Sequence, residues 1–365
     1  MLNNEKLKWA IIGAGNGGQA VAGFLGLTGH CVKLYDIYEE TVNTINQQGG
    51  IYLEGELKGY GRIQKATTDI EECLEGVDIV MIISPSLAHR SIAKDCAPFL
   101  KDHQIVVLHP GATFGALAFK KSLEDFHCQS KVTIAESNTL IFACRAIKTG
   151  TVLIAGIKNQ LLVSTIPAKN VEKVVNKLNL AFPEIKPVPN ILHTSLDNTN
   201  PMVHPAPTLL STSLVESEKE WLYYRDGITP SISEFIEEMD KERIAIGNAL
   251  GLALNTLKEQ YAIEYSVIED SLYEVFQNTK AYDEIKGFHN LQTRYLLEDI
   301  PMGLVPLVSI GKLLNVSVER METITNLAEL LLGKDLKRDG RTLENLGLSN
   351  MDASEIVEFI ETGEK

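Results

Sequence analysis

The sequence predicts an α/β domain followed by a mostly α-helical domain, and three observations carry this prediction. The first is the run from Lys8 to Gly18, in which a short apolar segment enters a glycine-rich turn. The second is the alternation of apolar segments with helix-like stretches through the first half of the chain, which is typical of a parallel sheet. The third is the proline-rich stretch 182–189, which is interpreted as a linker between domains, together with the helical periodicity that follows it. The predicted domains therefore cover residues 1–185 and 186–365.

The opening unit has the order strand, glycine turn, helix, strand and acid. Its glycines are Gly13, Gly15 and Gly18, its second apolar segment is Cys31 to Tyr35, and Asp36 follows that segment. Gly13 permits the tight turn out of the strand, Gly15 lets the backbone approach a pyrophosphate, and Gly18 lets the helix pack on the strand. The helix N-terminus then presents unpaired N–H groups to the phosphates. This order predicts a Rossmann dinucleotide-binding domain.

The acid at the end of the second predicted strand favours one cofactor. Asp36 lies eighteen residues after Gly18. A carboxylate there accepts hydrogen bonds from both ribose hydroxyls and repels a 2′-phosphate, so NAD is the preferred cofactor and NADP is the alternative. Asn16 and Gln19, at the start of the predicted helix, are expected beside the pyrophosphate. A glycine turn that binds no nucleotide is the structural alternative.

Ligands of an open parallel sheet bind beyond the carboxyl ends of its strands. Ser84 and Pro85 follow the apolar strand predicted over 78–83 and are expected near the adenosine or the second ribose. His109 ends the next apolar segment. It is either a neighbour of the nicotinamide or a structural histidine in a turn, and the sequence leaves both readings open. The segment 136–139 is expected along the same edge.

Composition narrows the class of partner. A net charge of −14 argues against nucleic acid or an anionic membrane surface as the main partner. Five scattered cysteines with no C-x-x-C pair predict reduced thiols, no metal site and a cytoplasmic location. No apolar run is long enough for a transmembrane helix, and Met1 to Lys6 lack the apolar core of a signal peptide. The oligomeric state stays open, with a homodimer as one option.

Two segments of the predicted helical domain contain candidate catalytic and substrate-binding residues. In the first, prolines bracket His204; in the second, Arg294 precedes Asp299 and a proline. Hydride transfer to a carbonyl or imine needs a proton source, and a histidine oriented by a carboxylate provides one near neutral pH. An arginine can bind a substrate carboxylate through two parallel hydrogen bonds. The structural alternatives are a core histidine and a surface ion pair of Arg294 with Glu298.

At these residues the chain resembles the opine dehydrogenase family, the enzymes related to octopine and nopaline dehydrogenases. The resemblance covers nearly the whole chain, with the motifs in the right order. The matching motifs are Gly13-x-Gly15-x-x-Gly18, Asn200-Pro201-Met202-Val203-His204-Pro205, the segment Tyr223 to Pro230, and Arg294-Tyr295-x-x-x-Asp299-x-Pro301-x-Gly303-Leu304.

The resemblance implies an enzyme that joins the amine of an L-amino acid to a 2-oxo acid, often pyruvate. NAD(P)H then reduces the imine to a secondary-amine dicarboxylate, an opine. It implies His204 as the general acid/base, Asp299 as the residue that orients and polarises it, and Arg294 as the ligand of a substrate carboxylate. It also implies that residues 139–145 contribute to the amino-acid pocket, although Cys144 in that stretch is more simply interpreted as a buried apolar thiol.

Two other interpretations share the cofactor domain. A hydroxyacid or glycerol-phosphate type dehydrogenase would reduce a carbonyl without an amine, but such enzymes usually place a lysine on a helix as the acid, and no lysine corresponds to His204. A catalytically silent NAD-binding protein that acts as a sensor or partner would show a degraded second half, yet His204, Arg294 and Asp299 are all present. Oxidation of NADH only when both an amine and an oxo acid are supplied separates the three.

Overall fold

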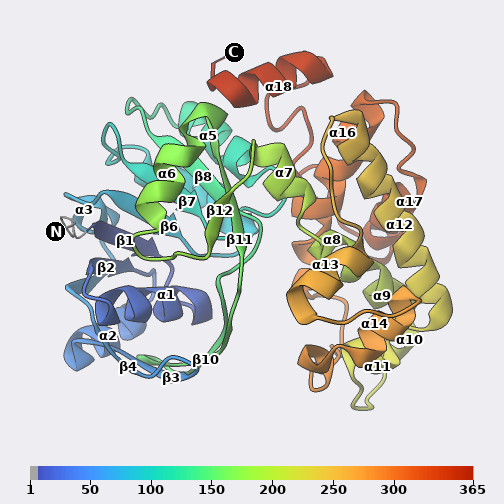
Figure 1. Cartoon of the computed structure of the whole chain (residues 1–365), viewed down its shortest axis with the longest axis horizontal. Coiled ribbons are helices and arrows are strands. Elements are labelled where there is room, and N and C mark those ends of the chain that lie inside the picture. Colours follow the sequence, from blue (N-terminus) through green and yellow to red (C-terminus); the bar gives the residue numbers. More distant parts are fainter. Residues whose placement is uncertain (1–6, 365) are drawn as a thin grey trace. The chain divides into compact units, whose positions relative to one another are not determined.

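The computed structural model describes residues 7–364, which form two compact units (Figure 1). Residues up to Thr194, together with those from Glu358 onward, make the first unit, and Ser195–Val357 make the second. The units divide at Thr194, whereas the sequence-based boundary stands at residue 185. The prediction about a signal peptide concerns residues 1–6, which lie outside the described residues. Among the described residues, no helix has both the length and the apolar character needed to span a bilayer.

The first unit is built on an eight-stranded sheet of order β12-β11-β8-β7-β6-β1-β2-β5. Neighbouring strands are parallel except for β8 and β11. Ile12 pairs with both Tyr35 and Ile82, so the carboxyl ends of the three central strands meet at one edge. The strands are β1 (Lys8–Ile12), β2 (Cys31–Tyr35), β5 (Lys65–Thr67), β6 (Ile79–Ile82), β7 (Ile105–Leu108), β8 (Thr133–Ser137), β11 (Leu161–Ile166) and β12 (Ile185–Pro187).

The central strands are apolar along their whole length because helices cover both faces of the sheet. Every residue of β6 and β7 is buried, as expected for parallel strands. The predicted parallel α/β domain is therefore confirmed. The helices of this unit are α1 (Asn16–Leu27), α2 (Glu39–Gln48), α3 (Ile70–Leu74), α4 (His89–Cys96), α5 (Gly115–Asp125), α6 (Val171–Leu178) and the start of α7 (Ile191–Leu196).

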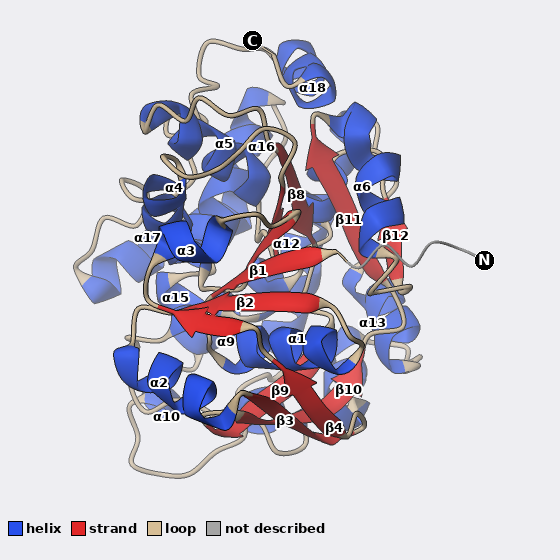
Figure 2. Cartoon of the chain, turned by 90° about the vertical axis from the view of Figure 1, so that its left-hand side faces the viewer, coloured by secondary structure: helices blue, strands red, loops and turns tan. Residues whose placement is uncertain are grey.

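A second, four-stranded sheet packs on helix α1, as Figure 2 shows. Its order is β4-β3-β10-β9, with β3 (Gly50–Gly55), β4 (Gly59–Arg62), β9 (Phe142–Lys148) and β10 (Thr151–Ile157). Contact is close because glycines face each other: a Cβ on Gly61 would lie 1.8 Å from the carbonyl oxygen of Gly23. Helix α1 is thereby held between the two sheets.

The proline-rich stretch 182–189 is not a linker. Ile185–Pro187 forms β12, which pairs in parallel with β11 at the edge of the large sheet. An edge strand leaves one row of backbone groups unpaired, so a residue without an N–H is tolerated there. The sequence-based interpretation of this stretch is therefore wrong, because local composition does not show that a neighbouring strand is available for pairing.

The second unit is helical, as predicted. Its long helix α12 begins as the sequence indicates: Pro230 takes the first position, and the Thr229 side chain accepts a hydrogen bond from the Ile232 N–H. The remaining helices are α8 (Asn200–Val203), α9 (Pro205–Leu210), α10 (Thr212–Val215), α11 (Tyr223–Asp226), α12 (Pro230–Ala249), α13 (Leu257–Tyr265), α14 (Leu272–Asn278), α15 (Arg294–Leu297), α16 (Val305–Leu313), α17 (Glu319–Leu332) and α18 (Ala353–Thr362), whose last residues belong to the first unit.

A buried arginine ties the long helix to two loops. Arg243 is fully buried and donates to Asp240 Oδ1 (2.7 Å), to the Leu196 carbonyl (2.9 Å) and to the Asn255 carbonyl (2.7 Å). The second oxygen of Asp240 accepts from the Leu257 N–H at 2.8 Å. The start of the unit, helix α12 and the start of α13 are thus joined through one guanidinium and one carboxylate.

Replacing Arg243 with Met should lower the free energy of unfolding by about 3 kcal/mol, because the buried Asp240 carboxylate loses its charge partner and two backbone carbonyls lose a hydrogen-bond donor. Lys241→Met on the same helix is the matched control, since its ion pair with Glu238 is exposed and screened by solvent, so its loss should leave the stability nearly unchanged. Chemical denaturation measures both. Equal stabilities of the two variants would contradict the importance of the buried network.

Candidate active site

Two of the three glycines in the turn are required by close packing, and the third is not. Gly13 has φ +105°, and a Cβ there would lie 2.4 Å from the carbonyl oxygen of Ile83. A Cβ on Gly18 would lie 1.7 Å from the carbonyl oxygen of Gly13. By contrast, a Cβ on Gly15, the residue that precedes helix α1, would meet nothing within 4 Å. The glycine at position 15 therefore leaves open space at a helix N-terminus, which fits a pyrophosphate.

Asp36 is fixed against the same turn. Its Oδ2 accepts a hydrogen bond from the Ala14 N–H at 2.6 Å, and its Oδ1 accepts from the Tyr38 N–H at 3.0 Å. The carboxylate is half-buried at the end of β2. An ionised carboxylate has about four acceptor positions, so both oxygens keep capacity for ribose hydroxyls.

The side chains of Asn16 and Gln19, at the start of α1, both form hydrogen bonds within the protein. Asn16 is exposed, and its side-chain oxygen accepts from the Ala146 N–H at 3.0 Å. Gln19 is buried, donates to the Ala14 carbonyl at 2.7 Å and accepts from the Gly150 N–H at 2.7 Å. One end of the Gln19 side chain is thus bonded to the glycine turn and the other to the smaller sheet, so this buried side chain acts in packing, and its place beside a pyrophosphate stays a prediction.

Ser84 and Pro85 lie at the carboxyl end of β6, as predicted. Ser84 is half-buried and Pro85 is exposed. They follow Ile83, whose carbonyl oxygen faces Gly13. The glycine turn, Asp36 and this segment thus share one edge of the large sheet.

His109 is a structural residue. Its Nε2 accepts from the Ile141 N–H at 3.1 Å, so Nδ1 carries the proton and donates to Ser137 Oγ at 2.8 Å. Ser137 Oγ in turn donates to the Thr139 carbonyl at 2.9 Å. Burial lowers the pKa of His109 to about 4, which keeps the ring neutral. Of the two readings left open by the sequence, the structure favours the histidine that braces a turn.

The predicted acid–base residues meet in the helical unit. His204 stands between α8 and α9, and Asp299 stands just before a single π-helical turn over Ile300–Leu304. Nδ1 of His204 lies 2.7 Å from Oδ2 of Asp299, and both side chains are buried. An ionised carboxylate can only accept, so Nδ1 carries the proton and Nε2 is left to accept or donate one.

Three tyrosines that the sequence analysis gave no role surround this histidine. The Tyr295 ring stacks on the imidazole, with ring centroids 3.7 Å apart and planes 1° apart. The Tyr224 hydroxyl lies 3.2 Å from Nε2, and the Tyr223 hydroxyl donates to the His204 carbonyl at 2.6 Å. Tyr223 and Tyr224 are consecutive residues of α11, and all three tyrosines lie in segments that match family motifs, which was the signal that could have pointed to them.

Arg294 opens helix α15, directly before the stacked Tyr295. It is exposed, and its guanidinium forms no hydrogen bond or ion pair with any residue that the structure describes. The surface ion pair with Glu298 that the sequence left open is therefore absent from the described residues. The guanidinium remains available to an anion.

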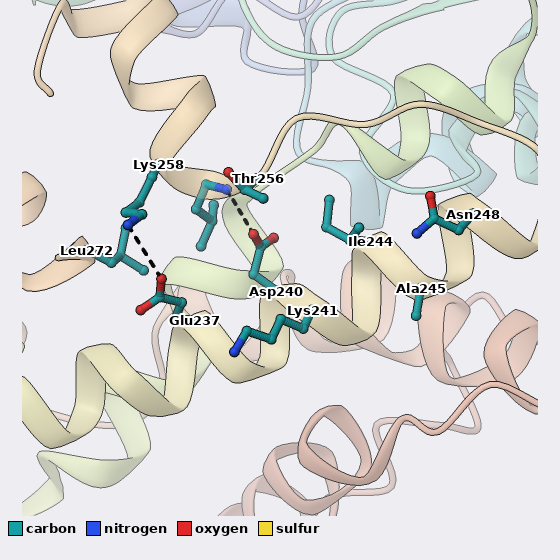
Figure 3. Close-up of a pocket in the computed structure, with 10 residues that line it drawn as sticks. Glu237, Asp240, Lys241, Ile244, Ala245, Asn248, Thr256, Lys258 and Leu272 are labelled. Carbon is teal, nitrogen blue, oxygen red and sulfur yellow. Dashed lines mark hydrogen bonds and ion pairs between the residues drawn. The ribbon is translucent and has the colours of Figure 1, made fainter. Parts of the chain in front are cut away.

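Other candidate groups do not form sites. Burial raises the pKa of the half-buried Cys144 thiol to about 11, so it is unreactive. Residues 7–364 contain no cluster of three or more acidic, histidine or cysteine side chains placed to hold a metal ion. A hollow of about 210 Å³ lies beside α12, and none of the predicted catalytic residues lines it. Figure 3 draws the side chains that line it, among them Asp240, whose carboxylate is already bonded to the Leu257 N–H.

Comparison with known proteins decides the family. The family model described as NAD/NADP octopine/nopaline dehydrogenase, alpha-helical domain, matches residues 187–332. The model described as NAD-dependent glycerol-3-phosphate dehydrogenase N-terminus matches residues 8–136. An opine dehydrogenase of Arthrobacter sp. (strain 1C) is 37% identical over 358 residues, which cover 98% of this chain and 99% of that one. The chain belongs to the opine dehydrogenase family.

Solved structures agree on the fold. Octopine dehydrogenase in complex with NADH and agmatine matches with a TM-score of 0.81 at 21% identity, over 98% of each chain. Octopine dehydrogenase with NADH and pyruvate matches with a TM-score of 0.80 at 20% identity, again over 98% of each chain. Membership of the opine dehydrogenase family makes the chain an NAD(P)-dependent oxidoreductase and confirms the order of a dinucleotide-binding domain and a helical domain.

The glycine turn yields a paired prediction. Gly15→Ala should fold with unchanged thermal stability, because its Cβ meets no protein atom, yet it should weaken NADH binding at least about tenfold by filling the space over the helix N-terminus. Gly18→Ala should instead lower the melting temperature, because its Cβ would overlap the Gly13 carbonyl. Fluorescence titration and thermal denaturation test the pair. Unchanged NADH affinity in Gly15→Ala would contradict the assignment of the turn.

Proposed function

We propose that this protein is an opine dehydrogenase that condenses an L-amino acid with a 2-oxo acid such as pyruvate and reduces the imine with NADH, NADPH being the alternative donor. The observation that carries the proposal is the buried His204–Asp299 pair, with an unpaired guanidinium one residue before the tyrosine stacked on that histidine. The balanced reaction consumes amine, oxo acid, NADH and a proton, and releases opine, NAD⁺ and water.

The cofactor would be held by the first unit. Gly13, Gly15, Asn16 and Gly18 form the turn that would receive the pyrophosphate, and Asp36 would accept both ribose hydroxyls. Ser84 and Pro85, on the same sheet edge, would border the adenosine side. When bound, the cofactor supplies a hydride to the imine carbon. The open space at Gly15 and the half-buried carboxylate of Asp36, which is bonded to the same turn, support this fit.

His204 would move the protons of the condensation. The amine attacks the oxo carbon only when neutral, so Nε2 takes the proton of the ammonium group. Loss of water from the resulting carbinolamine needs a proton on the departing hydroxyl, and the same imidazolium returns it. Asp299 holds Nδ1–H throughout and stabilises the imidazolium between the two transfers.

Arg294 would bind a substrate carboxylate. Both substrates are anions, whereas the chain carries a net charge of −14, so a local cation is needed to attract them. A guanidinium matches a carboxylate through two parallel hydrogen bonds. Its lack of partners among the described residues supports this role.

Location and assembly stay predictions. A cytoplasmic enzyme is supported by the five cysteines, all of which are free thiols. The homodimer has no support in a single chain.

A substrate panel tests the proposed function. NADH oxidation should appear only when pyruvate and an L-amino acid are supplied together, and it should be lost in His204→Ala, which removes the acid–base nitrogen. Turnover with the oxo acid alone would move the assignment to a hydroxyacid dehydrogenase. Absence of turnover with either NADH or NADPH across the panel, in protein that binds the nucleotide, would contradict the proposal.

A further inference from the structure

The acid–base histidine has a restraint at Nε2 that the proposed function does not use. Asp299 holds Nδ1, the Tyr295 ring covers one face, and the Tyr224 hydroxyl lies 3.2 Å from Nε2. We propose that Tyr224 is a positioning residue, whose hydroxyl keeps the His204 imidazole in one orientation in both its neutral and its protonated form. This inference rests on the proposed role of His204.

The direction of the hydrogen bonds follows from the carboxylate. Because Asp299 can only accept, the neutral imidazole carries its proton on Nδ1 and presents a lone pair at Nε2. The Tyr224 hydroxyl therefore donates to that lone pair. When His204 gains a proton, Nε2–H becomes a donor and the same hydroxyl oxygen accepts. A hydroxyl can act as both donor and acceptor of hydrogen bonds, whereas an amide N–H can only donate and a carbonyl or carboxylate oxygen can only accept.

Packing fixes the hydroxyl in place. Tyr224 is 3% exposed, its ring stacks on Tyr282 with centroids 3.7 Å apart, and Tyr223 meets it edge-on at 5.0 Å. The Tyr282 hydroxyl is itself bonded to that of Tyr261 at 2.6 Å. Burial holds the pKa of Tyr224 well above its usual range, so the phenol keeps its proton at neutral pH and remains a donor.

The two bonds to the imidazole are unequal. The contact of Nε2 with Tyr224 is 3.2 Å, whereas that of Nδ1 with Asp299 is 2.7 Å. The longer bond is the weaker, so Nε2 can exchange its partner for a substrate atom while Asp299 keeps the ring in plane. Tyr223, through the His204 carbonyl, fixes the backbone from the same helix.

The test compares Tyr224→Phe with Tyr282→Phe in the amine-dependent NADH assay. Tyr224→Phe keeps the ring and removes the hydroxyl, so kcat should fall about tenfold or more while the KM values for NADH, oxo acid and amine stay within about twofold. The acid limb of the pH–rate profile should move to lower pH by about half a unit, because the lost bond to the charged imidazolium is the stronger one. Tyr282→Phe, whose hydroxyl bonds Tyr261, should change neither quantity.

An unchanged kcat and pH profile in folded Tyr224→Phe would overturn the inference. His204→Ala in the same assay separates a failure of this inference from a failure of the proposed function. If His204→Ala is inactive while Tyr224→Phe is normal, only the inference about Tyr224 fails. If His204→Ala is active, the proposed function fails as well. NMR of ¹⁵N-histidine-labelled wild-type protein gives an independent readout, should the variant not fold. The resonance absent from His204→Ala should show the Nδ1–H tautomer, and an Nε2–H tautomer at neutral pH would overturn the inference.

Discussion

The hydrogen bond between His204 Nδ1 and Asp299 is the contact on which the proposed chemistry of the helical unit depends. It joins residues 95 positions apart, so two distant segments must lie against each other. Gly303 makes this approach possible, because a Cβ there would lie 2.3 Å from the ring of Pro201. The glycine and the proline in the two family motifs are thus explained by packing. Their close contact brings the carboxylate to the imidazole.

In the first unit, the three glycines of the turn also have different roles, because two are needed for packing and one leaves space for a ligand. At Gly13 and Gly18 a Cβ would collide with a neighbouring carbonyl oxygen, whereas a Cβ on Gly15 would meet no protein atom within 4 Å, which leaves room at a helix N-terminus. Asp36 is tied to the turn through the Ala14 N–H. The elements that fold the domain and those that leave space for a dinucleotide can therefore be told apart residue by residue.

The features that sequence predicted well are local. The buried strand β6 follows from its continuous apolar run, and the start of α12 follows from Thr229 and Pro230. The features that it missed depend on distant partners. The proline-rich stretch forms strand β12 because it pairs with β11 at the edge of the sheet. The Gln19 side chain accepts a hydrogen bond from the Gly150 N–H, which is 131 residues away. Residue types alone left the pairing of His204 with Asp299 as one option beside a core histidine, and the match of two motifs to a family favoured it.

The most direct test of this account is the kcat of Asp299→Asn in amine-dependent NADH oxidation. An amide nitrogen can donate to Nδ1, which would leave the imidazole proton on Nε2 and remove the base. The account predicts a fall in kcat of about a hundredfold or more, with little change in NADH binding or melting temperature. A variant that keeps kcat within about threefold of wild type would contradict the claim that Asp299 sets the tautomer of His204.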